Sequence, residues 1–291
     1  LVLKVEIPGM ALVGETDRHW IAAAGAGVDW HEFVCWTVAQ GWPGLENMAL
    51  IPGVCGAAPV QNIGAYGVEL QDRFEALDAI DLQTGEPFTL RADQCGFGYR
   101  DSVFKHAPAA PLAMGLKGRA LITQVRFALP KRWVPELGYL DLQKQVAATG
   151  IDKPTPQQVL DWVVGIRQAK LPDPQVIGNA GSFFHNPVVS SSQFEVLKGR
   201  FPDIIANATI TPQGKKYYKL AAGWLIDQCG FKGVRLGQIG VYDRQALVLV
   251  NHGGASASDL LELASQIKEK VHTVYGVDLV QEPITMPARS D

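Results

Sequence analysis

The chain has 291 residues, of which 47% are hydrophobic and 19% charged, and its formal net charge is −3. This composition excludes a largely disordered chain, and the slightly negative charge argues against a general nucleic-acid-binding protein. The four cysteines form no Cys-x-x-Cys pair and have no His cluster near them, which excludes the usual zinc and disulfide frameworks. We therefore expect a globular cytoplasmic protein without a metal site and without membrane insertion.

The first half of the chain is predicted to be rich in strands, with one clear helix. Residues 1–30 have the pattern of short strands separated by glycine turns, and residues 30–40 have the apolar spacing of a helix. Residues 74–91 and 121–129 alternate as strands do, with a turn at Thr84-Gly85. Because strands and helices do not alternate regularly along the chain, we predict an α+β fold rather than a doubly wound sheet.

Residues 50–70 fit neither strand nor helix periodicity and contain four glycines and three alanines. Glycine lacks a Cβ, so such a backbone can lie against a flat or phosphorylated ligand, or it can form a tightly packed loop. The residue types alone leave both interpretations open. The usual nucleotide motifs, Gly-x-Gly-x-x-Gly and Gly-x-x-x-x-Gly-Lys-Ser/Thr, are absent from the sequence.

The second half begins with a predicted helix over residues 156–168, which Thr155 caps and Pro156 opens. The prolines of Leu171-Pro-Asp-Pro174 indicate a domain boundary. Further along the chain we predict helices at 190–202 and 219–230, strands at 234–240 and 245–251, and a final helix from Ser256 or Ser258 to about Tyr275.

Three segments stand out by their composition and order: 52–67, 97–105 and 171–187. Together with 44–47 (Gly-Leu-Glu-Asn) and shorter stretches at 220–229 and 245–249, they resemble the MurB family of UDP-N-acetylenolpyruvoylglucosamine reductases (UDP-N-acetylmuramate dehydrogenases). The resemblance runs from residue 1 to about 286 and fits the subtype that carries a tyrosine-bearing loop, here residues 133–145.

The resemblance implies a fold and a domain organisation. We expect an FAD-binding fold of the PCMH/MurB type, N-terminally truncated, followed by a C-terminal α+β domain that binds the UDP-sugar. Residues 1–172 with 277–291 would form the first domain, and residues 173–276 the second. The family's Gly-x-Gly-Ser-Asn loop, which cradles the FAD pyrophosphate, has no equivalent in this sequence.

The resemblance also implies an activity. NADPH would reduce bound FAD, which would then reduce UDP-N-acetylglucosamine enolpyruvate to UDP-N-acetylmuramate for peptidoglycan synthesis. Such an enzyme serves cell-wall biogenesis, cell shape, cell division and the cell cycle in the bacterial cytoplasm, and we expect a monomer. Two alternatives stay open: another FAD-linked oxidoreductase of the same fold, or an inactive UDP-sugar-binding remnant without a complete flavin site.

Ser182 stands where the family places its proton donor, although by residue type alone it could simply cap the turn after Gly181. A serine can act as an acid when proton transfer to a basic carbanion is short and directed. Arg100 matches the family's active-site arginine, whose planar guanidinium suits a carboxylate; the structural alternative is a pair with Asp101.

The third catalytic residue depends on how the C-terminal segment is aligned. An ungapped count from Val277-x-Leu279 places Glu282 at the family's glutamate, whereas alignment on the following proline places Ile284 there. We choose Glu282 because only an acid suits the role.

The remaining site residues are carried over from the family. Tyr139 corresponds to the tyrosine of the substrate-closing loop, and lysines suit a diphosphate, although surface lysines are the structural alternative. The predicted substrate-binding residues are Tyr139, Lys170, Asn186, Lys232 and Gln245. The predicted flavin-binding residues are Gly53, Gly56, Ala57, Gln61, Asn62, Ile63, Gly64, Ala65, Tyr66 and Gly67.

Overall fold

A computed structural model describes residues 3–108, 115–210 and 214–285 of the chain. These residues form two compact units, Leu1–Arg167 and Gln168–Asp291, each with its own hydrophobic core. Helix α3 (Pro156–Lys170) runs through the division between them.

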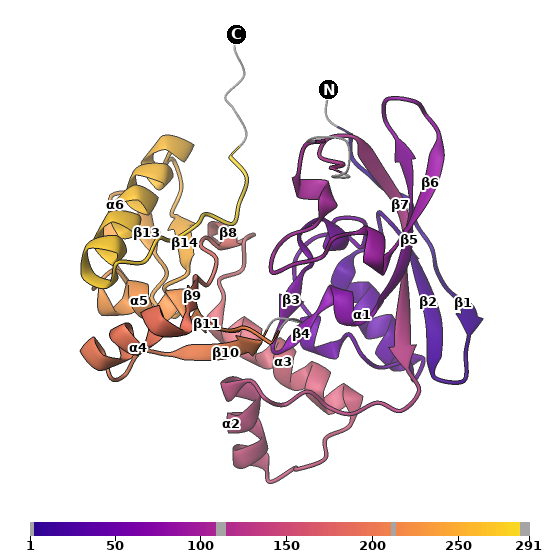
Figure 1. The fold of residues 1–291 in the computed structure, drawn as a ribbon, viewed down its shortest axis with the longest axis horizontal. Helices are drawn as coiled ribbons and strands as arrows, with labels where there is room; N and C mark the ends of the chain where they lie inside the picture. The colour runs from indigo at the N-terminus through magenta and orange to yellow at the C-terminus, as the bar shows by residue number, and fades with distance from the viewer. Residues whose placement is uncertain (1–2, 109–114, 211–213, 286–291) are drawn as a thin grey trace. The chain divides into compact units, whose positions relative to one another are not determined.

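The first unit is built on an antiparallel sheet of five strands (Figure 1). Its central strand, β7, places Ile122, Val125, Phe127 and Leu129 in the core, so the strand predicted at 121–129 is confirmed, with regular alternation from Val125 onward. The turn predicted at Thr84-Gly85 joins two of its strands, and Gly85 has φ 77°. The strands, in spatial order, are β1 (Met10–Glu15), β2 (His19–Gly25), β7 (Ala120–Pro130), β5 (Phe74–Asp81) and β6 (Pro87–Arg91).

Helix α1 (Trp30–Ala39) packs on this sheet, as the apolar spacing of residues 30–40 predicts. The Asp29 side chain caps it by accepting a hydrogen bond from the Glu32 N–H. The rings of Trp30 and Phe33 lie 5.7 and 5.2 Å, centroid to centroid, from the ring of Phe127 on β7. These aromatic contacts place the helix over the centre of the sheet.

Short elements make up the segment after α1, as its irregular composition predicts. Two strands of two residues each form a small hairpin at its end. Outside glycine, the described residues with positive φ are Leu50, Asn62, Tyr66 and Arg100, and three of the four lie in this segment. The short elements of the first unit are η1 (Glu46–Met48), η2 (Ala58–Gln61), β3 (Gly64–Ala65), β4 (Val68–Glu69), η3 (Leu70–Asp72), η4 (Ala92–Gln94) and η5 (Val103–Lys105).

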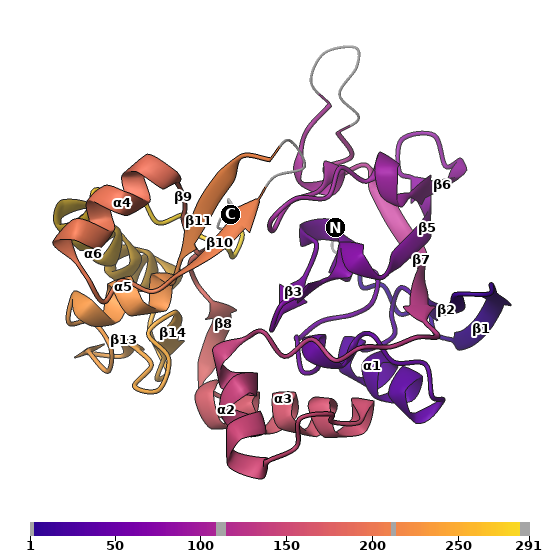
Figure 2. The same ribbon diagram turned by 60° about the horizontal axis from the view of Figure 1, so that its bottom comes forward.

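Two helices lie side by side at the end of the first unit (Figure 2). Helix α3 begins as predicted, with the Gln158 N–H donating to the Thr155 hydroxyl at 3.2 Å. The sequence does not predict helix α2 (Leu140–Thr149), in which Leu142 is the one buried residue. It buries a single leucine, Leu142, in the core that Val159 and Val163 of α3 also enter.

The second unit contains two small antiparallel sheets and three helices. The spatial order of one sheet is β12-β13-β14-β8, and that of the other is β10-β11-β9. The final helix begins after Ser256, whose side chain caps it, so the predicted start is confirmed. The strands are β8 (Gly178–Ser182), β9 (Val188–Ser190), β10 (Ala206–Ile210), β11 (Lys216–Leu220), β12 (Arg235–Leu236), β13 (Ile239–Val241) and β14 (Val248–Asn251). The helices are α4 (Ser191–Arg200), α5 (Ala222–Gln228) and α6 (Ala257–Tyr275).

Three details of the second unit differ from the sequence prediction. The strand predicted at 234–240 is a hairpin, because Gly237, with φ 62°, turns the chain between β12 and β13. The helix predicted at 219–230 is shorter, because its first two residues complete β11. Residues 277–285 belong to the second unit rather than the first, because Val277 and Leu279 pack in its core.

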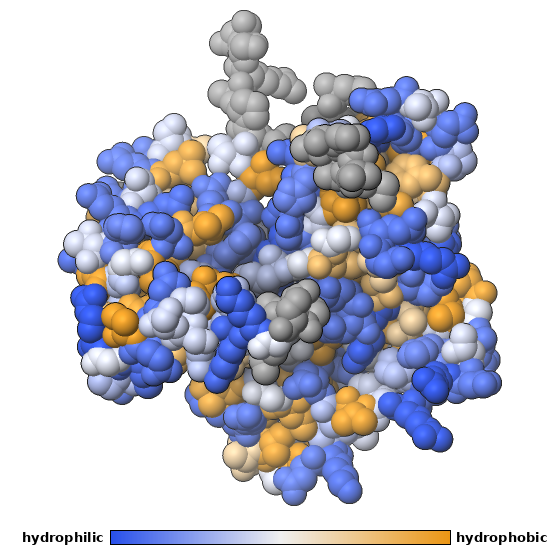
Figure 3. All heavy atoms as spheres, viewed as in Figure 1, coloured by the Kyte–Doolittle hydropathy of each residue, from blue (hydrophilic) through white to orange (hydrophobic). Residues whose placement is uncertain are grey.

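On the face drawn in Figure 3, hydrophobic residues are interspersed with hydrophilic ones. No helix within the described ranges has both the length and the hydrophobicity that crossing a bilayer requires.

Candidate active site

Ser182 is the last residue of β8 in the second unit, where strand pairing fixes its backbone. It pairs with Val248 of β14, and the next N–H, that of Phe183, donates to the Leu247 carbonyl at 2.7 Å. Gly181 has φ 69°, which glycine adopts readily, and its N–H donates to the Asn179 side chain. The serine side chain is half-buried. Ser182 is thus held on a regular frame just after a sharp local bend.

Glu282 lies beside this strand end through backbone pairing. Its N–H donates to the Phe183 carbonyl at 2.9 Å, and the next pair along, Phe184 and Gln281, forms an antiparallel bridge. The C-terminal segment therefore runs next to the residues that follow Ser182. Ile284, the alternative third residue, is 71% exposed. Of the two candidates, Glu282 is the one that the structure brings next to the Ser182 strand.

Asn186 and Gln245 meet at the first turn of α5. The side-chain oxygen Oδ1 of Asn186 accepts a hydrogen bond from the Ala222 N–H at 2.9 Å. A Cβ added to Gly223 would lie 2.9 Å from Oε1 of Gln245, so this glycine allows the glutamine to approach the helix closely. The Gln245 carbonyl in turn accepts from the Val248 N–H, opposite Ser182. These two predicted substrate residues therefore share one local framework with Ser182.

The predicted lysines lie at the margins of the second unit's elements. Lys170 is the last residue of α3, and Lys232 follows α5, with its Nζ 3.5 Å from Oδ2 of Asp227. The sequence prediction gave no role to Lys219, which pairs with Val188, two residues from Asn186. Lys219 could have been found only if residue 219 had been predicted as part of a strand, whereas the sequence pattern places it at the start of a helix.

Arg100, in the first unit, is hydrogen-bonded to residues 50–70, the glycine-rich segment. Its Nη2 donates to the Gly64 carbonyl at 2.9 Å, and its own carbonyl accepts from Lys105 Nζ at 2.9 Å. Its φ of 55° is unusual for a residue with a side chain. The Asp101 carboxylate contacts Nε2 of His106 at 2.8 Å. Arg100 and the predicted flavin-binding segment are therefore one local structure.

Asn62 organises the glycine-rich segment from within. It is fully buried with φ 44°, and its amide nitrogen donates to the Gly98 carbonyl at 2.9 Å and to Oε2 of Glu69 at 3.0 Å. Its oxygen accepts from the Gln71 N–H at 2.9 Å. These bonds hold the backbone in a conformation that most residues avoid.

The glycines of this segment serve different purposes. A Cβ on Gly56 would lie 2.5 Å from the Cβ of Ala26, so close packing requires that glycine. Gly53 has φ 115° and open space around its Cβ position. The packing interpretation therefore holds at Gly56, and contact between Gly53 and a ligand stays a prediction. An open glycine backbone of this kind fits a flat ring such as that of a flavin.

Tyr66 and Tyr139 face each other edge to face, with ring centroids 5.1 Å apart. Burial raises the pKa of Tyr66 to about 12 and also raises the pKa of Tyr139. The Tyr66 hydroxyl bonds the guanidinium of Arg167, whose Nη2 also donates to the Leu50 carbonyl at 3.1 Å. The sequence prediction missed Arg167, because the sequence of a helix does not show which loop carbonyl a half-buried arginine will bond.

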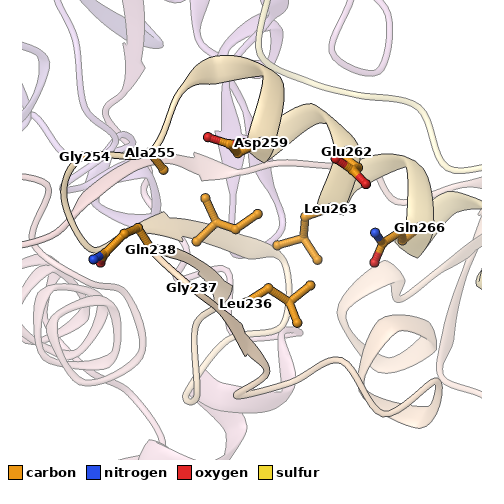
Figure 4. Close-up of a pocket in the computed structure, with 10 residues that line it drawn as sticks. Leu236, Gly237, Gln238, Gly254, Ala255, Asp259, Glu262, Leu263 and Gln266 are labelled. Atoms are coloured by element: carbon orange, nitrogen blue, oxygen red, sulfur yellow. The ribbon is translucent and has the colours of Figure 1, made fainter.

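A hollow of about 370 Å³ lies in the second unit between the β12–β13 hairpin and the start of α6 (Figure 4). Asp259 and Glu262 border it on α6, and Gln238 borders it on the hairpin. It contains none of the predicted site residues.

Comparison with known proteins identifies both halves of the chain. The family profile described as the C-terminal domain of UDP-N-acetylenolpyruvoylglucosamine reductase matches residues 173–286, and that of an FAD binding domain matches residues 2–91. The UDP-N-acetylenolpyruvoylglucosamine reductase of Bordetella pertussis is 53% identical over 289 residues, 99% of this chain and 79% of that protein. That of Burkholderia vietnamiensis is 52% identical over 288 residues, 98% of this chain and 79% of that protein.

A solved structure shares the fold. The crystal structure of UDP-N-acetylenolpyruvylglucosamine reductase (MurB) from Thermus caldophilus aligns with a TM-score of 0.59, covering 91% of this chain and 72% of that one. The sequence identity is 24%, so this match supports the fold alone.

Proposed function

Because this chain belongs to the family of UDP-N-acetylenolpyruvoylglucosamine reductases, we propose that it reduces UDP-N-acetylglucosamine enolpyruvate to UDP-N-acetylmuramate, using FAD and NADPH. The observation that carries this proposal is the identity of 53% over 99% of the chain. The bound FAD supplies hydride, taken from NADPH, to C3 of the enolpyruvyl group. The chain's own residues must then bind the substrate, stabilise its enolate and protonate C2.

Ser182 is the residue we assign to the protonation of C2. Strand pairing with Val248 and the hydrogen bond from the next residue to Leu247 fix its backbone. A weak acid needs such a fixed position, because proton transfer to the carbanion is fast only over a short, directed path. Glu282, held beside the strand by its bond to Phe183, would polarise the enol or adjust the surroundings of Ser182.

Arg100 is the residue we assign to the substrate carboxylate and to the charge that develops on it. A guanidinium can donate two parallel hydrogen bonds to a carboxylate, and these strengthen as negative charge grows. Its bond to the Gly64 carbonyl keeps it next to the segment assigned to the flavin. That segment supplies Gly53, Gly56, Ala57, Gln61, Asn62, Ile63, Gly64, Ala65, Tyr66 and Gly67 as the flavin side of the site.

We assign five of the chain's residues to the binding of the UDP-sugar. In the second unit, Asn186 and Gln245 are placed by the first turn of α5, and Lys170 and Lys232 carry positive charge suited to a diphosphate. In the first unit, Tyr139 presents a ring that is 43% exposed. We further propose that the protein acts as a monomer in the bacterial cytoplasm, where its product serves the cell wall and thereby the cell cycle.

Anaerobic half-reactions test the proposed function. The purified chain is loaded with FAD, reduced with NADPH, and then mixed with UDP-N-acetylglucosamine enolpyruvate while flavin absorbance is followed. We expect bleaching in the first step, recovery in the second, and UDP-N-acetylmuramate as the product by mass spectrometry. Protein that takes up FAD but gives no recovery with this substrate would point to a different FAD-linked oxidoreductase. Protein that cannot take up FAD would be an inactive remnant.

A further inference from the structure

The segment that leads from β7 to Tyr139, residues 131–138, has no helix or strand but is held at two points by neighbouring residues of η1. The indole Nε1 of Trp133 donates to Oε1 of Glu46 at 2.6 Å. The side-chain nitrogen of Asn47 donates to the Glu136 carbonyl at 2.9 Å. Glu46 and Asn47 are 2% and 1% exposed, so the two side chains that hold the segment are themselves buried.

Asn47 also holds the segment assigned to the flavin. The same side-chain nitrogen donates to the carbonyl of Tyr66 at 2.8 Å. An amide nitrogen has two hydrogens, and here one goes to each segment. Because leaving a buried polar group without a partner is unfavourable, separating the two segments at this point would destabilise the protein.

The two segments that Asn47 joins also contact each other directly. The ring of Tyr66 meets the ring of Tyr139, with centroids 5.1 Å apart. Gly67 has φ 89°, and a Cβ there would lie 3.0 Å from Cγ of Glu136, so the Glu136 side chain packs closely over this glycine. Oε1 of Glu136 then accepts from the Gly138 N–H at 3.0 Å, which stiffens the last residues before Tyr139.

We propose that Glu46 and Asn47 are positioning residues that clamp the Tyr139 segment onto residues 64–67. The clamp makes the substrate-side tyrosine and the flavin-side loop move as one body, so that the position of Tyr139 is set from the flavin side. This inference rests on the proposed function, which assigns residues 62–67 to the flavin and Tyr139 to the substrate. Neither Glu46 nor Asn47 is assigned a contact with substrate or cofactor.

The decisive variant is Asn47→Asp, which keeps the size and shape of the side chain. It replaces the NH2 group that donates both hydrogen bonds with an oxygen that faces two carbonyl oxygens. We expect the KM for UDP-N-acetylglucosamine enolpyruvate to rise about tenfold, as the loss of one net hydrogen bond predicts, with kcat changed less than about twofold. We also expect a shifted visible spectrum of the bound FAD, because Tyr66 loses its anchor. A purely structural role would lower the melting temperature and leave the KM and the spectrum unchanged.

Trp133→Phe tests the second point of the clamp, since it removes the bond to Glu46 while keeping an aromatic ring. Its matched control is Trp36→Phe, which trims a half-buried indole of the same unit whose ring partners are Phe33 and Trp42. We expect a raised KM with Trp133→Phe and an unchanged KM with Trp36→Phe. Trp133→Phe also serves if Asn47→Asp fails to fold.

The outcomes separate the two proposals. If wild-type protein restores no flavin absorbance with this substrate, the proposed function fails, and the clamp fails with it. If wild-type protein is active but the KM is unchanged in both clamp variants, or rises equally in Trp36→Phe, the clamp alone is overturned.

Discussion

The glycine-rich segment of the first unit and the end of strand β8 at Ser182 in the second unit fix their backbones by different means. In the first, Leu50, Asn62 and Tyr66 adopt positive φ, and buried side chains bond the backbone to hold it there. In the second, ordinary strand pairing fixes the backbone. A regular frame leaves side chains available for chemistry, whereas an irregular backbone uses its side chains to maintain its own shape. Substitutions in the second region should therefore affect the reaction with little change in stability, whereas those in the first should also change the stability or the shape of the backbone.

The strongest test of this contrast is Ser182→Ala. We expect reoxidation of the flavin by substrate to slow by about 10²- to 10⁴-fold, the usual contribution of a positioned acid, while reduction by NADPH persists. The melting temperature should not change, because pairing with Val248 uses only the backbone. Stopped-flow absorbance separates the two half-reactions, and equal loss of both would contradict the role of proton donor.

A serine with a purely structural task supplies the control. Ser190 caps α4 by accepting from the Gln193 N–H. Ser190→Ala should lower stability by about 1 kcal/mol and leave both half-reactions intact.

Glu282→Gln is expected to have the next largest effect. The backbone bond to the Phe183 carbonyl survives, but the negative charge is lost, so we expect reoxidation to slow by roughly ten- to a hundredfold, as loss of one charged hydrogen bond of about 1.5–3 kcal/mol predicts. Glu269→Gln, on an exposed position of α6, is the matched control. A silent Glu282→Gln would show that the ungapped alignment at the C-terminal segment is incorrect.

Gly56→Ala tests the other side of the contrast, because the added Cβ would lie 2.5 Å from that of Ala26. We expect urea unfolding to show a loss of about 1–3 kcal/mol, the usual cost of overpacking. Gly199 in α4 has open space at its Cβ position and helical geometry, so Gly199→Ala should stabilise the protein by about 0.5–1 kcal/mol. Equal effects at the two glycines would refute the packing explanation for Gly56.

The smallest expected effect concerns the sheet that supports the glycine-rich segment. Hydrogen bonds from Arg126 lower the pKa of Asp78 in the folded protein. Its contribution to stability is therefore present above its unfolded pKa of about 3.9 and disappears as the pH falls through the lower folded value. Asp78→Asn should flatten the acid side of a plot of urea midpoint against pH. An unchanged slope would show that the pair is screened by solvent.

The regular elements were largely predictable from the sequence, because periodicity carried the signal. Helices α1, α3 and α6 and strand β7 follow apolar spacing and capping residues such as Ser256. Helix α2 was missed because Leu142 is its one buried residue. The hairpin at 234–240 was missed because Gly237 reverses the chain direction within a segment predicted as one strand.

The candidate site was only partly predictable, for a physical reason. Sequence order could suggest Ser182 and Glu282, but their adjacency depends on pairing between segments almost a hundred residues apart. The stretch 44–47 contributed to the resemblance, but neither the role of Asn47 nor that of Arg167 could be predicted, since both consist of bonds to backbone carbonyls at distant positions. Such bonds depend on how the chain folds back, and no local pattern of residues encodes them.

Asn62 has a consequence for how a bound flavin could be recognised. Both of its amide hydrogens already serve protein acceptors, Gly98 and Glu69, and its oxygen serves the Gln71 N–H. Its side chain therefore has no remaining donor to offer a ring. At this position, recognition of a planar molecule would then depend on peptide groups, whose positions mutation can shift but whose chemical identity it cannot alter.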